Sequence, residues 1–263
     1  MSEADLSRSF SKSQVDKLGD ALRKSDDPSE DELDRLQRIR LDYDAPMAFM
    51  ERVLREELSL EASSRLKTAN TIVDKLRRER TRLSSMQDIA GIRIVLDMTM
   101  SVQDQIGARI RGRFPEADII DRRRTPSHGY RALHLVPAVS GFPVEVQIRT
   151  VKQDLWAQVL ESLADRWGRG IRYGLPPDEP DAVVLLVGSR EVTRREFVED
   201  MTLRLSPLIA SLEEAQDTLE EALARGDVGE EIADSRDQIR EVDAEVRVML
   251  QTLAQAFARV DRP

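Results

Sequence analysis

Five polar side chains of different chemistry fall at alternating positions of two predicted strands. They are Glu145, Gln147 and Arg149 in FPVEVQIRT (142–150), and Tyr130 and His134 in YRALHLV (130–136). Because successive side chains of a strand point to opposite faces, each set lies on one face and most of the aliphatic residues lie on the other. If the strands pair, a carboxylate, an amide, a guanidinium, an imidazole and a phenol meet on one sheet face, as they do in functional sites. The alternative is an ordinary solvated face.

Asp88 adds a second carboxylate. It lies just before the β-branched run GIRIVLD (91–97), where a strand edge can bring it near Glu145. Two carboxylates leave room for water and phosphate oxygens around Mg²⁺, and therefore suit a metal–triphosphate complex. The chain has no cysteine and only two histidines, which argues against thiolate and structural zinc sites and leaves a hard metal ion on carboxylates. A capping or turn role is the alternative for Asp88.

Basic residues are concentrated in the middle of an acidic chain. The net charge is −9, yet one stretch contains Arg65, Lys67, Lys75, Arg77, Arg78, Arg80 and Arg82, and another contains Arg109, Arg111, Arg113, Arg122, Arg123, Arg124 and Arg131. Arginine and lysine bind phosphate oxygens as bidentate forks and point charges, respectively. The pattern therefore predicts a local polyanion site, for a nucleoside triphosphate or an RNA end, with solvated helix faces as the alternative.

The elements that must position these residues predict an α+β fold. Strands are predicted at 91–97, 117–123, 130–139 and 142–150, and helices in the first 60 residues and at 68–83, 101–114 and 155–167. We expect a small mixed β-sheet flanked by N-terminal helices and followed by a C-terminal antiparallel helical hairpin. The corresponding division is an N-terminal helical segment (1–62), a site-bearing domain (63–174) and the hairpin (175–263).

The hairpin is predicted from two apolar seams. From residue 182 onward the spacing is helical, and Gly226 and Gly229 interrupt it. In the second run, apolar residues recur every seven positions, with Val242 and Met249 between them: Ile232, Ile239, Val246, Leu253 and Val260. Such a hairpin either packs on the core or contacts a partner.

Three blocks of sequence together resemble the synthetase domain of the RelA/SpoT alarmone synthetases. They are SSRLKTANTIVDKL (63–76), QDIAGIRIVLD (87–97) and GYRALHLVPAVSGFPVEVQIRT (129–150), and the resemblance covers residues 63–174. Such domains have a nucleotidyltransferase-like fold and transfer the β,γ-pyrophosphate of ATP to a ribose 3′-hydroxyl. The resemblance therefore implies an ATP-dependent pyrophosphokinase that uses Mg²⁺.

The resemblance also implies a role for each matching residue. Asp88 and Glu145 would hold the Mg²⁺ and, with Gln147, form the catalytic set. The residues implied for ATP binding are Arg65, Lys67, Lys75 and Arg93. Those implied for the acceptor are Tyr130, which stacks on its base, with His134 and Arg149 beside it. Upstream, Arg122, Arg123 and Arg124 are candidates to follow the acceptor's backbone.

The loop before Gly129 departs from the family pattern. In RRRTPSHGYR (122–131), Pro126 and His128 stand where alarmone synthetases usually carry a lysine and an asparagine or serine. The helix that follows is similar to that of the toxic small alarmone synthetases of toxin–antitoxin pairs, members of which pyrophosphorylate the 3′-CCA end of tRNA. We therefore expect a tRNA 3′ end as the acceptor and a growth-inhibiting role. The alternatives are a (p)ppGpp or ppApp synthetase and an inactive module that binds a partner through the hairpin.

The composition also indicates the cellular environment and the partners that we expect. No apolar run approaches the roughly 20 residues that span a bilayer, and the absence of cysteine suits a reducing cytoplasm. The expected partners are ATP and either tRNA or a guanosine or adenosine nucleotide. The sequence leaves open an antitoxin protein and self-association through the C-terminal helices.

Overall fold

A computed structural model describes residues 8–187 and 189–258 of the chain. The chain divides into two compact units that alternate along the sequence. The first unit comprises Met1–Ile94, Ile106–Ile120 and His134–Ile148, and the second comprises Val95–Gln105, Asp121–Leu133 and Arg149–Pro263. The division into three consecutive segments stays a prediction.

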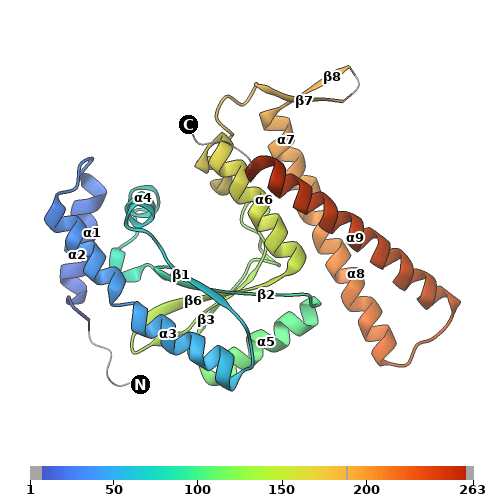
Figure 1. The fold of residues 1–263 in the computed structure, drawn as a ribbon, viewed down its shortest axis with the longest axis horizontal. Helices are drawn as coiled ribbons and strands as arrows, with labels where there is room; N and C mark the ends of the chain where they lie inside the picture. Colours follow the sequence, from blue (N-terminus) through green and yellow to red (C-terminus); the bar gives the residue numbers. More distant parts are fainter. Residues whose placement is uncertain (1–7, 188, 259–263) are drawn as a thin grey trace. The chain divides into compact units, whose positions relative to one another are not determined.

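The first unit is built on a six-stranded sheet (Figure 1). The strand order is β1 (Ser63–Leu66), β2 (Ala90–Leu96), β6 (Phe142–Thr150), β4 (Leu133–Val136) and β3 (Asp118–Asp121), with β5 (Ala138–Val139) paired to β6. A two-residue turn joins β5 to β6, as predicted. Ser140 and Gly141 there have φ angles of 50° and 80°, which match the right-handed twist of a tight hairpin.

One face of this sheet is apolar and the other is polar. Residues at alternate positions are fully buried: Ile92, Ile94, Leu135, Val144, Val146 and Ile148. The positions between them carry polar side chains: Arg93, His134, Glu145 and Gln147. The alternation predicted for 142–150 is therefore confirmed. It places the polar side chains that could do chemistry on the face opposite the hydrophobic core.

Helices of the first unit begin at side-chain caps with one exception, the third, whose N-cap Tyr43 makes no side-chain hydrogen bond. They are α1 (Lys12–Lys24), α2 (Glu30–Leu41), α3 (Asp44–Arg52), which continues into a π turn (Val53–Glu57), and α4 (Ala69–Glu79). Ser11 and Ser29 each form a reciprocal capping box. Thr68 caps α4 close after β1, so Lys67 lies just before the helix and Lys75 within it, and both reach Asp88. The helix α5 (Met100–Arg113) begins in the second unit and ends in the first.

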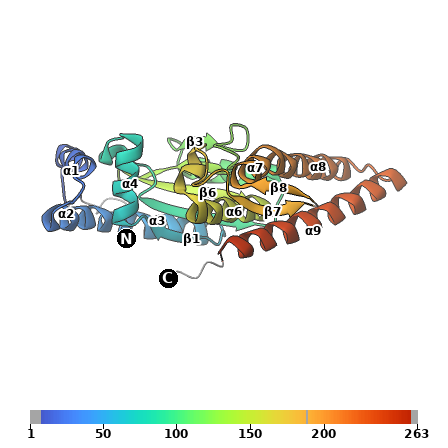
Figure 2. The same ribbon diagram turned by 90° about the horizontal axis from the view of Figure 1, so that it is seen from above.

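The second unit is mainly helical (Figure 2). Its elements are α6 (Val151–Trp167), a 3₁₀ turn (Arg169–Tyr173), the hairpin strands β7 (Val183–Val187) and β8 (Arg190–Thr193), α7 (Arg194–Asp200), a π turn (Met201–Leu205), α8 (Ser206–Ala224) and α9 (Glu230–Ala258). A single hydrophobic cluster joins α6, α8 and α9, and its buried members include Trp156, Ile209 and Leu250. The predicted break between two helices falls at residues 225–229, where α8 turns into α9.

The structure differs from the sequence prediction in three local features. The segment after residue 182 is not wholly helical, because its β-branched start pairs with residues 190–193 as a two-stranded sheet. The edge strand β1 was not predicted, since four residues are too few to show a period. In the described part of α9 the buried positions are Val246, Leu250 and Ala254, four residues apart, whereas Val242 and Met249 are exposed. Val260, the last residue of the predicted seam, lies outside the described residues.

Within the part of the chain that the structure describes, no helix has both the length and the hydropathy of a membrane span.

Candidate active site

Two lysines and an aspartate meet at the edge of the sheet in the first unit. Lys67, at the end of β1, and Lys75, on α4, donate hydrogen bonds from Nζ to Oδ2 of Asp88, at 2.5 and 2.7 Å. The main-chain N–H of Lys67 also bonds the carbonyl of Ile89, which holds the end of β1 beside the start of β2. The other oxygen of Asp88, Oδ1, is buried and accepts no hydrogen bond from any described residue. One oxygen of this carboxylate therefore has no hydrogen-bond partner among the described residues.

Glu145 lies at the centre of the polar sheet face. Its Oε1 is 2.9 Å from Nδ1 of His134 on β4, and its Oε2 accepts a hydrogen bond of 2.7 Å from Nε2 of Gln147 on β6. The side chain is only 14% exposed, so these partners orient a carboxylate that is largely out of water. Of the five side chains predicted to share one sheet face, these contacts bring together His134, Glu145 and Gln147. Tyr130 lies outside the strand predicted for it, because β4 begins only at Leu133.

The electrostatics keep both carboxylates ionised. Burial raises the pKa of Asp88, but the charges and hydrogen bonds of Lys67 and Lys75 outweigh burial and hold that pKa below its usual value. Burial likewise raises the pKa of Glu145, and the hydrogen bond from His134 leads the contributions that lower it overall. The negative charge of Asp88 acts on Glu145 in the opposite direction, so the two carboxylates influence one another. Their mutual repulsion favours a cation between or beside them.

Arg65 and Arg93 extend the polar face across β1 and β2. Arg65 pairs with Gly91, and Arg93 pairs with Ser63, so the two arginines occupy diagonal positions on one face of the antiparallel pair. The side chain of Arg65 is exposed. The first unit therefore presents four cations and two carboxylates: Arg65, Lys67, Lys75 and Arg93 with Asp88 and Glu145.

The second unit holds the other predicted site residues. Arg149 donates hydrogen bonds of 2.9 Å to Asp154 and to the hydroxyl of Tyr130, and its guanidinium lies 5.2 Å from the centre of the tyrosine ring. Tyr130 is half-buried and packs against the hydrophobic cluster of this unit. We expected an exposed ring at Tyr130. The structure instead shows a ring with one part packed and its hydroxyl oriented by an arginine.

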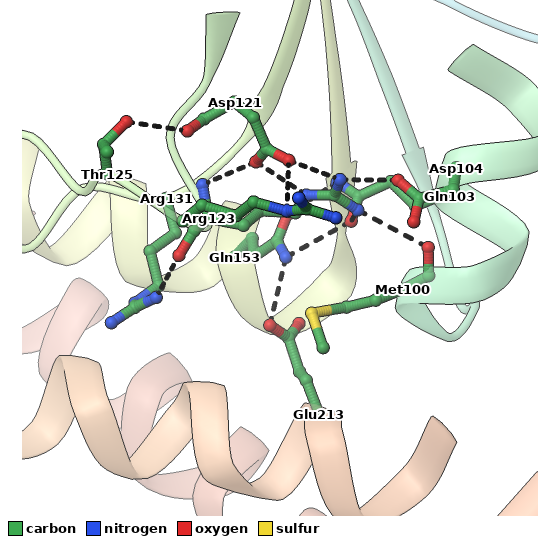
Figure 3. A network of polar contacts seen from close by, with 10 residues as sticks. Met100, Gln103, Asp104, Asp121, Arg123, Thr125, Arg131, Gln153 and Glu213 are labelled. Atoms are coloured by element: carbon green, nitrogen blue, oxygen red, sulfur yellow. Dashed lines mark hydrogen bonds and ion pairs between the residues drawn. The ribbon is translucent and has the colours of Figure 1, made fainter. Parts of the chain in front are cut away.

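The loop before Gly129 is stabilised by a network around Arg123 (Figure 3). Arg123 donates hydrogen bonds to both oxygens of Asp121, to Asp104 and to Gln103, and its side chain is 8% exposed. A buried guanidinium with these partners serves the structure of the loop, not the binding of a flexible polyanion. Arg124 differs, because its side chain is 83% exposed and its nearest carboxylate oxygen is 3.5 Å away.

Gly129 ties the same loop to two helices. Its carbonyl accepts hydrogen bonds from Nε1 of Trp156 on α6, at 2.8 Å, and from Oγ of Ser206 on α8, at 2.7 Å. The φ angle of 86° at Gly129 favours glycine at this position. Sequence reasoning missed Trp156 and Ser206 because nothing in their spacing relates them to a loop so distant in the sequence.

The Arg123 network makes stability dependent on acid pH. Burial raises the pKa of Asp121, but hydrogen bonds and charge from Arg123 hold it below its usual value. A carboxyl group whose pKa is lower in the folded protein adds stability above its unfolded pKa, near 3.9, and loses it as the pH falls through the folded value. We expect the melting temperature of Asp121→Asn to be lower than that of the wild type at pH 7. The difference between the two melting temperatures should become smaller below about pH 4. Melting curves from pH 3 to 7, with exposed Asp181→Asn as control, test this; a constant difference would contradict it.

Comparison with known proteins identifies the family. Residues 64–165 match the model of the region found in RelA/SpoT proteins. An uncharacterized protein of Mycobacterium tuberculosis is 36% identical over 182 residues, which are 67% of each chain. The chain belongs to the RelA/SpoT family. It is a pyrophosphokinase of the RelA/SpoT type, which goes against the hypothesis of an inactive module.

Other relatives agree with this membership. YjbM, a GTP pyrophosphokinase of Bacillus subtilis, is 32% identical over 127 residues, 41% of this chain and 58% of YjbM. Among solved structures, the small alarmone synthetase 1 of Bacillus subtilis matches with a TM-score of 0.53 at 21% identity, over 73% of this chain and 99% of the other. This structural likeness supports the predicted α+β fold.

RelA/SpoT synthetases use ATP and a divalent metal ion, and the residues present fit such an ion. The free, buried Oδ1 of Asp88 and the ionised carboxylate of Glu145 are hard oxygen ligands. No group of three or more histidine, aspartate or glutamate side chains suited to a metal occurs among the described residues. A metal ion would therefore take its remaining ligands from water and phosphate oxygens, as Mg²⁺ does in nucleotide complexes.

Proposed function

We propose that the protein transfers the β,γ-pyrophosphate of ATP to a ribose 3′-hydroxyl at the polar sheet face of the first unit. The observation that carries this proposal is the Lys67–Asp88–Lys75 cluster, whose one unpartnered carboxylate oxygen is electrostatically coupled to Glu145. A site that binds a metal–triphosphate needs carboxylates for the metal and an excess of cations for the phosphates. Four cations against two carboxylates satisfy both needs.

Each side chain then has a task in the transfer. Arg65 and Arg93 bind phosphate oxygens, and Lys67 and Lys75 neutralise charge while they hold Asp88 in place. Glu145, ionised at neutral pH, accepts a hydrogen bond from the attacking 3′-hydroxyl, and His134 and Gln147 fix its orientation. A bound Mg²⁺ would neutralise charge that develops on the phosphates. Transfer of this kind is mostly positioning and charge neutralisation.

For the acceptor we propose the 3′-CCA end of tRNA, which makes the protein a growth-inhibiting toxin held in check by an antitoxin. Tyr130 would stack on the terminal base, and Arg149 orients the ring by its hydrogen bond to the hydroxyl. Pro126 and His128 replace residues that alarmone synthetases usually use beside a guanosine nucleotide. Arg122 and Arg124 would follow the acceptor's phosphates, whereas Arg123 maintains the loop.

The second candidate is an alarmone synthetase that uses GDP, GTP or an adenine nucleotide. It is favoured by the relationship to YjbM, a GTP pyrophosphokinase. The two candidates share the chemistry at Glu145 and differ in the size of the acceptor, and therefore in the number of phosphates that the protein contacts.

An acceptor panel separates the two candidates. We expect γ-³²P-ATP to label total tRNA, and not GDP or GTP, and Arg122→Ala/Arg124→Ala to reduce that labelling with a weaker dependence on salt. Each lost phosphate contact reduces the slope of log affinity against log salt by roughly 0.7 to 0.9. A matched double variant on α9, Arg236→Ala/Arg240→Ala, controls for loss of surface charge. Robust labelling of GDP or GTP with no label on tRNA at low salt would overturn the tRNA proposal and leave the alarmone synthetase standing.

Arg65 and Lys67 should determine the use of ATP. We expect Arg65→Ala and Lys67→Ala each to raise the KM for ATP by about tenfold or more, because the first removes a charge-assisted contact to the triphosphate and the second removes a charge that neutralises it and holds Asp88 in place. The KM for the acceptor should change far less. Initial rates over a matrix of ATP and acceptor concentrations measure both constants, with the exposed Arg111→Ala on α5 as control. If the KM for ATP is unchanged in both variants, Arg65 and Lys67 do not bind ATP and are ordinary solvated surface residues.

A further inference from the structure

A cavity of about 320 Å³ opens beside the loop that carries Gly129. Its walls come from the 3₁₀ turn after α6, the residues 174–177 that follow it, α7 and the π turn, all within the second unit. Apolar side chains dominate these walls, among them Ile171, Pro177, Val198 and Leu203. This volume is at the small end of ligand pockets.

Two charged side chains of opposite sign line the same cavity. Arg195 and Glu199 are one turn apart on α7, and no described residue gives either side chain a hydrogen bond or ion pair. Thr202, the next polar residue of the wall, is different, because its hydroxyl donates to the carbonyl of Val198 at 2.8 Å. The cavity therefore offers the hydrogen-bond donors of one guanidinium and the acceptor oxygens of one carboxylate, beside apolar walls. That balance of charge disfavours a polyphosphate and suits a flat, uncharged polar molecule.

The wall formed by His128 is held in place by the backbone. His128 has a φ angle of 50°, which is uncommon for a residue with a side chain. Its ring occupies the space where a Cβ on Gly174 would lie, and Gly174 itself has a φ angle of 75°. Thr202 and Leu203 belong to a π turn, a feature that recurs at functional sites. These irregular backbone positions together shape the opening of the cavity.

We propose that this cavity binds the cytosine that precedes the terminal adenosine of the acceptor. The inference deepens the proposed function and rests on a tRNA 3′ end as the acceptor. Tyr130 and the cavity flank Gly129 in the same unit, so one loop can serve two consecutive bases. The carboxylate of Glu199 accepts a hydrogen bond from the exocyclic N4 amino group of cytosine, and Arg195 donates to its O2 and N3. The ring of His128 covers one face of the base.

This chemistry predicts discrimination between the two pyrimidines. Uracil has a carbonyl oxygen where cytosine has the amino group, so it would place an acceptor against the carboxylate of Glu199. A glutamine at this position has both a donor and an acceptor and would tolerate either base. The expected difference in affinity for one such contact is about tenfold or more.

Binding of dinucleotides without ATP tests the proposal separately from catalysis. The probes are CpA and UpA, each with a free 3′-hydroxyl, titrated calorimetrically into the full chain. We expect CpA to bind about tenfold more tightly than UpA, and Glu199→Gln and Arg195→Ala to remove most of that preference. The neighbouring Asp200→Asn and Arg204→Ala, which lie outside the cavity, should keep it. Equal binding of CpA and UpA, or a preference that survives Glu199→Gln, would overturn the proposal.

A glycine pair tests the shape of the cavity. Gly174→Ala should weaken CpA binding because the added methyl group displaces His128. Gly226→Ala is the matched control, since Gly226 has a similar φ angle of 85° but nothing near its missing Cβ. Equal CpA affinities of the two variants would contradict the role of His128. The species that ³²P labels tests the proposed acceptor separately from the cavity. An enzyme that labels GTP and does not bind CpA would refute the tRNA acceptor. An enzyme that labels tRNA but does not prefer CpA to UpA would refute only the cytosine site.

Discussion

Asp88→Asn and Glu145→Gln should each reduce pyrophosphate transfer by at least about 100-fold. Either substitution removes one of the two negative charges that we propose to hold the metal ion against the triphosphate, and loss of such stabilisation costs several kcal/mol in the transition state. Glutamine at 145 can still accept a hydrogen bond from His134, so the sheet face should keep its shape. Steady-state rates with saturating ATP and acceptor measure the loss. Either variant with more than a tenth of the wild-type rate would show that the metal assignment is wrong.

The folded state of these variants must be measured alongside their rates. Asp88→Asn removes the negative charge that both Lys67 and Lys75 contact, so the two neighbouring positive charges repel one another. Some loss of stability is therefore expected for Asp88→Asn. Glu116→Gln, an exposed carboxylate in the first unit, controls for removal of a negative charge. A raised Mg²⁺ requirement in Glu145→Gln would separate a metal ligand from a purely structural carboxylate.

Leu250→Ala should lower the free energy of unfolding by about 2–5 kcal/mol. The side chain is fully buried in the cluster that joins α6, α8 and α9, and truncation there leaves a cavity that close-packed neighbours cannot fill. Val248→Ala, on the same helix but 62% exposed, should change it by no more than about 0.5 kcal/mol. Urea denaturation followed by circular dichroism measures both variants. Similar values for the two would mean that α9 does not pack in solution as it does here.

The same cluster predicts the effect of removing the C-terminal helices. A chain that ends at Pro180 would lose Ile209, Leu212 and Val246 from the core and leave one side of Trp156 and Leu160 exposed to water. We therefore interpret the hairpin first as part of the core of the second unit. The exposed apolar residues of the hairpin, such as Val248 and Met249, remain accessible to a partner.

Strand alternation was the most informative sequence signal. The period of two along 142–150 correctly separated the buried valines from Glu145 and Gln147, because a strand with one buried face has little freedom of register. The position of Asp88 could be placed beside a strand, but its two lysine partners could not be predicted. Lys67 and Lys75 reach it only because β1 ends in a capped helix start, a tertiary arrangement that leaves no periodic pattern.

Arg123 has a structural role that the sequence could not reveal. In sequence it is one of three adjacent arginines, and nothing distinguishes it from Arg122 and Arg124. In the structure it is buried among Asp104, Asp121 and Gln103, from elements that the sequence placed in different parts of the chain. The β7–β8 hairpin was missed for a related reason, because a short apolar run fits a helix or a strand equally well until its pairing partner is known.

The alternation of the two units along the chain has a consequence for biosynthesis. Every segment of the first unit has left the ribosome once residue 148 has emerged, whereas the second unit lacks α8 and α9 until its last segment is made. Since nascent chains fold from the N-terminus, the sheet with Asp88 and Glu145 can assemble early. Gly129, however, finds its two hydrogen-bond donors, Trp156 and Ser206, only later. The loop before Tyr130 thus gains its anchors at Gly129 only after the sheet is complete, so an unfinished polypeptide would carry an assembled polar sheet face while this loop still lacked both anchors.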